Sequence, residues 1–331
     1  MINKNQNILF IGLGGAGQRH LRIFRELLPE NNFYALRKKY KTPLLNSNFT
    51  VNNENTISRK YNISELKDED LIDNIKPILT VISCPTKFHA KYTKLAFRAG
   101  SNVLVEKPGF SSKREFDEIN NLFMNSELIY QVGFQRIHNP LFIKLKNYIK
   151  ENNLGKLISG DVNVSSYIPD WHKYENFNEL YACRKELGGG VLLTECHEIN
   201  MMCDLFGEPS NIRIFPKFNK KFNLDVEDTI QINSIFKNAN INFDISFLRK
   251  SKERKISLIF AKGNLILDLE KNYLSVKNKG EKKLIKSKVD NDENFFSQAK
   301  EVIKLINKNK EVLEKQRYFS RFIQTFEENQ N

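Results

Sequence analysis

The first 130 residues of the chain consist of short apolar runs separated by segments with helical spacing. Each apolar run is rich in β-branched and aliphatic residues and is followed by turn residues, as in a buried strand. These runs lie at 7–11, 32–36, 78–83 and 102–105. Between them, 18–28 and 89–99 carry apolar residues three and four positions apart, which predicts helices. Strands that alternate with helices favour a parallel sheet.

The rest of the chain changes to a two-residue period. Residues 157–167 alternate between apolar and polar positions, as in a half-buried strand. Further strands are expected at 131–135, 225–236, 240–247, 255–260 and 264–269. Helices are expected at 141–149, 191–206, 293–306 and 312–326. Strands that follow one another without intervening helices favour an antiparallel sheet, so the two halves of the chain are expected to differ in architecture.

Glycines join the first predicted strand to the first predicted helix. Gly12 permits a tight turn, Gly14 lets the backbone approach a phosphate, and Gly17 lets the helix pack closely on the strand. Gly15 and Ala16 complete the loop, and the N-terminus of the helix favours anionic oxygens. The loop therefore predicts a dinucleotide site on a doubly wound sheet, with a purely structural glycine-rich turn as the alternative.

Two later segments bear on the cofactor. Arg37 and Lys38 follow the second strand, where an acidic residue would bind the ribose hydroxyls of NAD. A guanidinium there can pair with a 2′-phosphate, which favours NADP(H) over NAD(H) unless these bases are only loop surface. The loop after the third strand follows the carboxyl edge of the sheet and is expected to line the ribose and nicotinamide. Its candidate contacts are Ser83, Pro85, Thr86 and His89.

Composition narrows the class of protein. The length of 331 residues favours two domains, and the net charge of +13 comes from basic residues scattered through Lys/Asn-rich turns. Without an aromatic-interleaved basic stripe or a recognition helix, no nucleic-acid partner is expected. No apolar run suits a membrane span or a secretory leader, and sparse cysteines favour a reduced cytoplasm. Cys196, His197 and Cys203 lie close together, but no second ligand cluster supports a metal site.

Four motifs carry a family resemblance: Gly12–Gly17, Pro85–Thr86 followed by His89, Glu106–Lys107–Pro108, and Gly188–Pro209. In these motifs the chain resembles the Gfo/Idh/MocA oxidoreductase family over nearly its whole length. The resemblance implies an α/β fold, with an NAD(P)-binding Rossmann domain at 1–130. It implies a substrate-binding α+β domain on a mostly antiparallel open sheet at 131–331, and a homodimer or homotetramer. Members oxidise or reduce hydroxyl and carbonyl groups of sugars, inositols or nucleotide sugars.

The same resemblance assigns the candidate catalytic residues. It places Glu106 at the cofactor and Lys107 at the substrate oxygen beside the nicotinamide, and His197 matches the family's active-site histidine. A lysine at a strand's carboxyl end can exchange a proton, and a histidine can relay one near neutral pH. Many members have an aspartate where this chain has Thr194, and Asn200 also stands where an acid is frequent. Acid–base chemistry is therefore expected from Lys107 and His197 only, with a different substrate geometry or weakened catalysis left open.

A loop of mixed aromatic and polar residues follows the strand at 157–167. Aromatic rings can cover the apolar faces of a sugar while polar groups bind its hydroxyls, although the rings could instead anchor the loop or a subunit contact. The expected substrate contacts are Lys107, Arg136, Trp171, His172, Tyr174, Arg184, Thr194 and His197.

The loop resembles a subset of the family that acts on sugars for surface glycans. The expected function is hydride transfer between NAD(P)(H) and a secondary hydroxyl or carbonyl of a sugar or sugar-nucleotide. A reductase of a non-sugar carbonyl is one alternative. A non-catalytic dinucleotide-binding sensor or scaffold is the other, suggested by Thr194 and Asn200.

Overall fold

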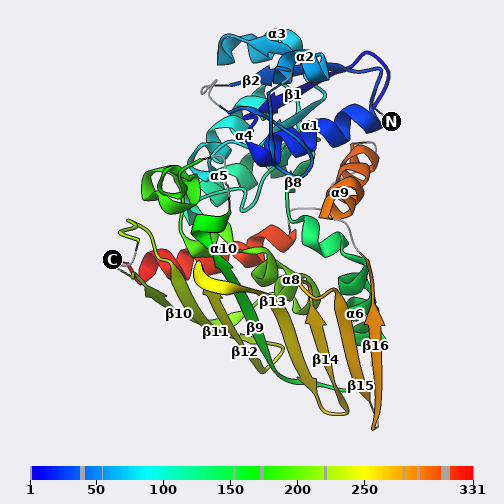
Figure 1. Ribbon diagram of the computed structural model, residues 1–331, viewed down its shortest axis with the longest axis vertical. Helices are drawn as coiled ribbons and strands as arrows, with labels where there is room; N and C mark the ends of the chain where they lie inside the picture. The colour runs from blue at the N-terminus through cyan, green and yellow to red at the C-terminus, as the bar shows by residue number, and fades with distance from the viewer. Residues whose placement is uncertain are drawn as a thin grey trace. The chain divides into compact units, whose positions relative to one another are not determined.

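The chain forms two compact units, each with its own sheet (Figure 1). The first unit comprises Met1–Gly133 and Phe295–Glu314, and the second comprises Phe134–Asn294 and Lys315–Asn331. The computed structural model describes residues 2–37, 42–53, 55–151, 154–171, 175–219, 222–278, 280–288, 291–306 and 314–330.

The first unit contains a six-stranded parallel sheet in the order β5-β2-β1-β6-β7-β8. Its strands are β1 (Asn7–Ile11), β2 (Asn32–Leu36), β5 (Ser64–Leu66), β6 (Leu79–Ile82), β7 (Asn102–Val105) and β8 (Tyr130–Val132). The strand order reverses between β1 and β6, and in such sheets ligands bind at that point, outside the carboxyl ends of the strands. The predicted parallel sheet is confirmed.

Helices pack on this sheet, as its apolar strands require. The helices of the first unit before α9 are α1 (Gly15–Leu27), α2 (Ile57–Tyr61), α3 (Ile72–Ile75), α4 (His89–Arg98) and α5 (Lys113–Met124), with single 3₁₀ turns η1 (Glu69–Leu71) and η2 (Thr86–Phe88). A small hairpin joins β3 (Leu44–Leu45) to β4 (Val51–Asn52).

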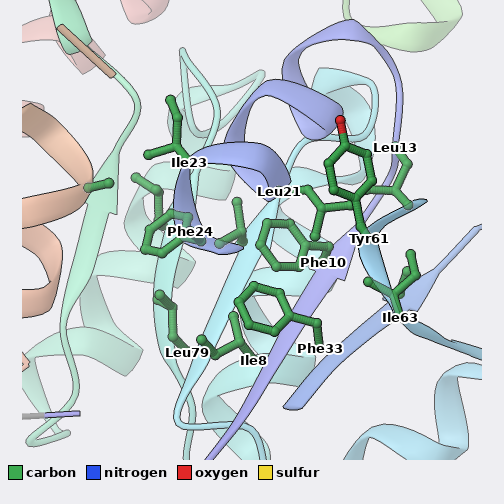
Figure 2. Packing of buried hydrophobic residues seen from close by; sticks show 14 of the residues in the cluster. Ile8, Phe10, Leu13, Leu21, Ile23, Phe24, Phe33, Tyr61, Ile63 and Leu79 are labelled. Carbon is green, nitrogen blue, oxygen red and sulfur yellow. The ribbon is translucent and has the colours of Figure 1, made fainter. Parts of the chain in front are cut away.

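Aromatic packing fixes α1 on the sheet. Figure 2 shows Leu21 and Phe24 of α1 facing Phe10 of β1. The ring of Phe10 stacks on Phe33 of β2 with centroids 5.8 Å apart, and it meets Phe24 edge-on at 6.2 Å. These side chains are almost completely buried, so a dense apolar contact holds the start of α1 in place above the end of β1.

Helix α9 (Asn291–Leu305) returns the chain to the first unit. Phe295, Ala299 and Val302 are buried in the same apolar cluster as the residues of β1 and α1. The domain boundary expected at residue 130 would assign this helix to the second domain. The apolar period of a helix does not reveal which of the two sheets the helix covers. The compact units instead place the boundary after Gly133 and group Phe295–Glu314 with the first unit.

The second unit contains an eight-stranded sheet in the order β10-β11-β12-β9-β13-β14-β15-β16. Its strands are β9 (Leu157–Tyr167), β10 (Ser210–Lys217), β11 (Thr229–Phe236), β12 (Ala239–Ser246), β13 (Leu248–Phe260), β14 (Gly263–Asp268), β15 (Tyr273–Asn278) and β16 (Glu281–Lys286). All neighbouring pairs are antiparallel except β12 with β9, which is parallel. This confirms the mostly antiparallel open sheet.

Short helices and turns pack beside the strands of the second unit. They are η3 (Gln135–His138), α6 (Pro140–Lys150), η4 (Ile168–Asp170), η5 (Phe177–Glu179), η6 (Tyr181–Cys183), η7 (Lys185–Leu187), α7 (Val191–Thr194), α8 (His197–Phe206) and α10 (Glu314–Glu328). Phe322 of α10 packs against Phe236 and Phe243 of the sheet, which shows that α10 covers the apolar face of β11 and β12.

Three local predictions are corrected. The single helix expected at 191–206 is two helices, because the chain leaves helical geometry at Glu195 (φ −103°, ψ 39°), whose side chain is held elsewhere. The strand expected at 131–135 ends at Val132, and Gln135 begins a 3₁₀ turn. The strands at 210–217, 273–278 and 281–286 were not predicted, since their apolar positions are too few for a clear period.

Candidate functional site

In the glycine loop of the first unit, close contacts with neighbouring atoms require glycine at some positions but not at others. A Cβ on Gly12 (φ +86°) would lie 2.8 Å from the backbone nitrogen of Cys84, and one on Gly17 would overlap the carbonyl oxygen of Gly12 and lie 2.5 Å from Ser83 Oγ. A Cβ on Gly14 would meet no atom within 4 Å. Gly12 and Gly17 are therefore required by the fold itself. Gly14 presents open space in front of the N-terminus of α1.

Two polar side chains lock this loop. Ser83 Oγ donates to the carbonyl oxygen of Gly12 at 2.7 Å, so Ser83 is committed to the loop. Gln18 is completely buried; its Nε2 donates to the carbonyl oxygens of Leu13 (3.1 Å) and Pro43 (2.9 Å), and its Oε1 accepts from a backbone N–H of the β3–β4 hairpin. Sequence reasoning missed Gln18, although a polar residue directly after the last glycine, on the buried side of α1, was a usable signal.

Pro85, Thr86 and His89 follow β6 in a turn, in η2 and at the start of α4, respectively. Thr86 is 1% exposed, and its Oγ1 has no hydrogen-bond partner among the described residues. His89 Nε2 donates to the carbonyl oxygen of Cys84 at 2.8 Å, and burial lowers the pKa of His89 to about 4, so its ring is neutral at physiological pH. His89 therefore shapes the turn, while the Thr86 hydroxyl remains available to a ligand.

Glu106 and Lys107 follow the carboxyl end of β7. Glu106 Oε1 accepts from His20 Nε2 at 2.8 Å, and Oε2 accepts from the backbone N–H of Lys107 at 3.2 Å. Burial alone would raise the pKa of Glu106, but the bond from His20 and the charges of His20, Lys107 and His89 bring it below its ordinary value. Glu106 is thus an ionised, internally bonded carboxylate beside Lys107, and the Lys107–Pro108 peptide is cis.

Arg37 and Lys38 were predicted to meet the adenosine end of the cofactor. Arg37 Nη1 lies 3.2 Å from Glu65 Oε1 on β5, and Nη2 donates to the carbonyl oxygen of Thr42 at 3.3 Å. Ser58 Oγ also donates to Glu65 Oε1. Because the Arg37 side chain is only 9% exposed, it serves first as the counterion of Glu65. Lys38 lies outside the described residues.

The first unit fits a dinucleotide on its own geometry. The open side of Gly14 and the N-terminus of α1, which no side chain of its N-cap residue caps, together suit a pyrophosphate. The hydroxyl of Thr86 adds a buried donor along the same carboxyl edge of the sheet. Within the described ranges, no group of three or more His, Cys, Asp or Glu side chains is arranged to hold a metal ion, and no helix is long and apolar enough to span a membrane.

In the second unit, an acidic loop holds the triple-glycine turn before α7. The Glu227 carboxylate accepts from the backbone N–H of Leu192 at 3.0 Å, and a Cβ on Gly190 (φ +103°) would collide with that carboxylate. Asp225 accepts from the backbone N–H of Lys185 at 2.9 Å. Burial raises the pKa of Glu227 to about 7. The glycines are therefore required by a close backbone approach, and the loop fixes where α7 begins.

Arg254 of β13 connects the sheet to both acidic residues that flank His197. Its Nη1 donates to both carboxylate oxygens of Glu198 at 3.1 Å, and its Nη2 donates to Glu195. Burial lowers the pKa of Arg254, but the two carboxylates outweigh that effect and raise it. Glu195 and Glu198 are committed to this cluster, so His197 remains the titratable group of the turn that suits proton transfer.

His197 and Arg136 gather on neighbouring elements. The ring of His197 meets Phe134 edge-on with centroids 5.9 Å apart, and Arg136 Nε lies 3.9 Å from Glu198 Oε1. Burial and the nearby Arg254 charge lower the pKa of Arg136 to about 10. Thr194 ends α7, is 2% exposed, and is separated from His197 by the turn at Glu195. The structure thus brings Arg136 to the helix that carries His197.

The aromatic loop has internal contacts. Trp171 meets Phe247 edge-on with centroids 5.2 Å apart, and Phe247 is completely buried, so Trp171 anchors the loop on the sheet. Arg184 forms an ion pair with Glu186. His172 and Tyr174 lie outside the described residues. The contact of Trp171 with Phe247 therefore supports the loop-anchoring interpretation at Trp171, and the exposed Arg184 pair is local to its own turn.

Both units match known families of domains. A family model for an "oxidoreductase family, NAD-binding Rossmann fold" matches residues 6–134, and one for a "GFO/IDH/MocA C-terminal domain" matches residues 142–266. A levoglucosan dehydrogenase from Pseudarthrobacter phenanthrenivorans is 26% identical over 148 residues, which is 43% of this chain and 36% of that protein. An oxidoreductase from Formosa agariphila is 26% identical over 147 residues, covering 44% of this chain and 46% of the relative. The chain thus matches less than half the length of these curated relatives.

Solved structures share the fold at low sequence identity. Levoglucosan dehydrogenase in complex with NADH superposes with a TM-score of 0.83 at 16% identity, covering 98% of this chain and 96% of the other. A UDP-N-acetylglucosamine 3-dehydrogenase from Acidithiobacillus ferrooxidans gives a TM-score of 0.75 at 14% identity, covering 98% and 97%. At such identities the likeness demonstrates the fold.

Gly14 and Gly17 allow a matched test of whether the loop binds the dinucleotide. Gly14→Ala should fold with a loss of stability below about 1 kcal/mol, since its Cβ meets no protein atom, but should weaken NADH binding at least about tenfold. Gly17→Ala should lose about 1–3 kcal/mol of stability because its Cβ overlaps backbone. Thermal unfolding and NADH fluorescence titration measure both effects. Wild-type NADH affinity in Gly14→Ala would contradict the assignment.

Replacing Arg254 is expected to lower the free energy of unfolding far more than replacing Arg249 of the same strand. Arg254→Met leaves two buried carboxylates without their cation and should cost about 3–5 kcal/mol of unfolding free energy. Arg249→Met removes a solvent-exposed pair with Asp244 and should cost about 0–1 kcal/mol. Urea unfolding of both variants provides the comparison; equal losses would mean that the cluster does not hold α8.

Proposed function

The chain belongs to the Gfo/Idh/MocA oxidoreductase family, and from that premise we propose that it is a nicotinamide-dependent dehydrogenase or reductase acting on a secondary hydroxyl or carbonyl group. One observation carries the proposal. The glycine loop after β1, the Thr86 turn after β6 and Lys107 after β7 all follow the carboxyl ends of neighbouring strands in one parallel sheet. A dinucleotide and a reacting group at that edge would share the same protein surface.

Acid–base chemistry falls to Lys107 and His197. During oxidation, the substrate hydroxyl loses its proton as the hydride leaves the same carbon, and the ammonium of Lys107 stabilises the developing alkoxide. His197 relays the proton, since Glu195 and Glu198 are engaged by Arg254. When bound, the nicotinamide supplies the hydride acceptor or donor. Reduction follows the same steps in reverse.

A sugar or sugar-nucleotide is the proposed substrate class, in a step of surface-glycan synthesis. The support is that the family relatives reported above include levoglucosan dehydrogenase and UDP-N-acetylglucosamine 3-dehydrogenase. The proposed polar contacts of the substrate in the second unit are Arg136, a partly exposed cation on the turn that contacts α8, and the buried Thr194 hydroxyl. Trp171, His172, Tyr174 and Arg184 are retained as proposed contacts of the loop.

The cell compartment and the assembly are also proposals. The four cysteines are free thiols, three of them buried, which suits the reducing cytoplasm. A homodimer or homotetramer would cover the polar face of the open sheet, where Phe215 is an exposed apolar side chain. Light scattering that gave only a monomer would contradict the assembly.

Lys107 provides the central test of the function. Lys107→Met should lower turnover about 10²–10⁴-fold while changing the NADH dissociation constant less than about threefold, because it removes a group that acts in the transition state. Lys91→Met, which removes an exposed lysine paired with Glu69, serves as the control. Substrates to assay include levoglucosan, UDP-N-acetylglucosamine, a panel of sugars and non-sugar carbonyls.

Each outcome of that assay decides between functions. Near-normal turnover in Lys107→Met would refute the role of Lys107. Turnover of a non-sugar carbonyl alone would favour the other class of reductase. Tight nucleotide binding with no turnover in the wild-type protein would favour a sensor or scaffold. Failure to bind either NADH or NADPH would refute the proposed function.

Glu65 is expected to decide between NAD(H) and NADP(H). Because Glu65 neutralises Arg37, a 2′-phosphate would have to displace a carboxylate, and we expect wild-type protein to bind NADH at least as tightly as NADPH. Glu65→Gln should tighten NADPH binding about tenfold, roughly 1.4 kcal/mol, with NADH little changed. Arg37→Met combined with Glu65→Gln should remove that gain. A wild-type preference for NADPH would instead support the NADP(H) expectation from Arg37 and Lys38.

A further inference from the structure

A histidine outside the recognised motifs joins three distant segments of the first unit. His20 lies in α1 and is 1% exposed. Its Nε2 donates to Glu106 at the end of β7 at 2.8 Å, and its ring meets Phe295 of α9 edge-on, with centroids 5.3 Å apart and planes at 70°. The hydrogen bond to Glu106 is the ring's single hydrogen bond in the described ranges, since Nδ1 is buried without a partner there. The imidazole is thus committed to one carboxylate.

The Glu106 carboxylate also forms a hydrogen bond with Lys107. Glu106 Oε2 accepts from the backbone N–H of Lys107, so the orientation of the Glu106 side chain and the backbone of Lys107 are linked. Three charged or titratable groups face Glu106: His20 from α1, Lys107 from its own loop, and His89 from α4. Of these, His20 is the one that the structure shows bonded directly to the Glu106 carboxylate from another element.

Helix α9 packs against the imidazole ring of His20. The ring of Phe295 contacts both His20 and the guanidinium of Arg19, which lies 4.7 Å from the ring centroid. Gln298 Nε2 donates to the carbonyl oxygen of Val132 on β8 at 3.4 Å, which ties α9 to the sheet. The Phe295 ring, from a helix near the C-terminal end of the chain, therefore restricts the imidazole to the orientation that reaches Glu106.

We propose that His20, held by Phe295 of α9, is a positioning residue of the reaction: it acts through Glu106 to orient Lys107. The proposal rests on the proposed role of Lys107 and assigns a function to a histidine and to a helix that the family motifs leave without one. His20 keeps Glu106 ionised against the cost of burial, and Glu106 then fixes the backbone of Lys107 and offers its ammonium a neighbouring negative charge. Without the His20 bond, Glu106 would protonate more readily and lose that anchor.

The test compares two replacements of His20 and two phenylalanines of α9. His20→Leu removes the donor and keeps an apolar side chain, whereas His20→Gln can place an amide N–H near the same carboxylate. Phe295→Leu removes the ring that packs against His20. Phe296→Leu serves as its control, because Phe296 is the neighbouring residue and packs on the same apolar cluster. Each variant is studied as the full chain.

The first readout is the ionisation of Glu106 and needs no substrate. In protein with ¹³C-labelled glutamate carboxyls, the Glu106 resonance is identified by its loss in Glu106→Gln and is followed against pH. The hydrogen bond from His20 lowers the pKa of Glu106, so His20→Leu should raise that pKa. His20→Gln should restore most of the difference. Phe295→Leu should lie between them, and Phe296→Leu should match the wild type.

The second readout is kinetic, on whichever substrate of the panel is turned over. His20→Leu should reduce kcat at least about tenfold, with the NADH dissociation constant changed less than about threefold. Since activity requires the ionised Glu106, the acidic limb of the pH–rate profile should move to higher pH by the same shift as the Glu106 titration. His20→Gln should return the profile toward that of the wild type.

The outcomes separate this inference from the function on which it rests. An unchanged Glu106 titration and pH profile in His20→Leu would overturn the inference, even if the variant were less stable. If His20→Leu does not fold, the titration of Phe295→Leu decides, because a Glu106 titration equal to that of Phe296→Leu would overturn the inference. Normal turnover in Lys107→Met would instead overturn the proposed function, while the Glu106 titration would still report whether His20 controls this carboxylate.

Discussion

A carboxylate that is removed from water keeps its charge only where hydrogen bonds or cations compensate it, and both units are organised around such groups. Glu106 precedes Lys107 and accepts a bond from a buried histidine of α1. Glu198 follows His197 and is bound through both oxygens by Arg254. Each residue assigned to proton transfer is therefore the sequence neighbour of a buried carboxylate whose partner comes from another element. The carboxylates act as anchors, and the residues beside them are the ones that we propose for proton transfer.

Thr194 stands where the family resemblance leads us to expect an acid. Two carboxylates are present at the α7–α8 turn, at Glu195 and Glu198, but both are bound by Arg254 of the sheet. The chain leaves helical geometry at Glu195, the same residue whose carboxylate Arg254 binds. His197 begins α8 directly after this bend.

Segments far apart in the sequence complete the first unit. The return of α9 buries Phe295, Ala299 and Val302 in the core that fixes α1, and the same helix contacts His20. The glycine loop is therefore supported from two sides: by its own close approach at Gly17, and by a helix from the end of the chain. A local motif and a long-range contact both determine how the edge of the sheet is presented.

Local periodicity and steric demands, read from the sequence alone, were enough for the parallel sheet, for most strands of the second sheet and for the glycine loop, while the family resemblance singled out Lys107 and His197. Those features depend on residues close together in the chain, where an apolar period or a glycine between a strand and a helix has one main interpretation. The partners of buried charges were decided only by the tertiary structure. Glu106 meets His20 across 86 positions and Glu198 meets Arg254 across 56, and a sequence period records neither the identity nor the direction of a side chain so far away. Compensation of buried charge is a property of three-dimensional packing, so it appears only once the chain has folded.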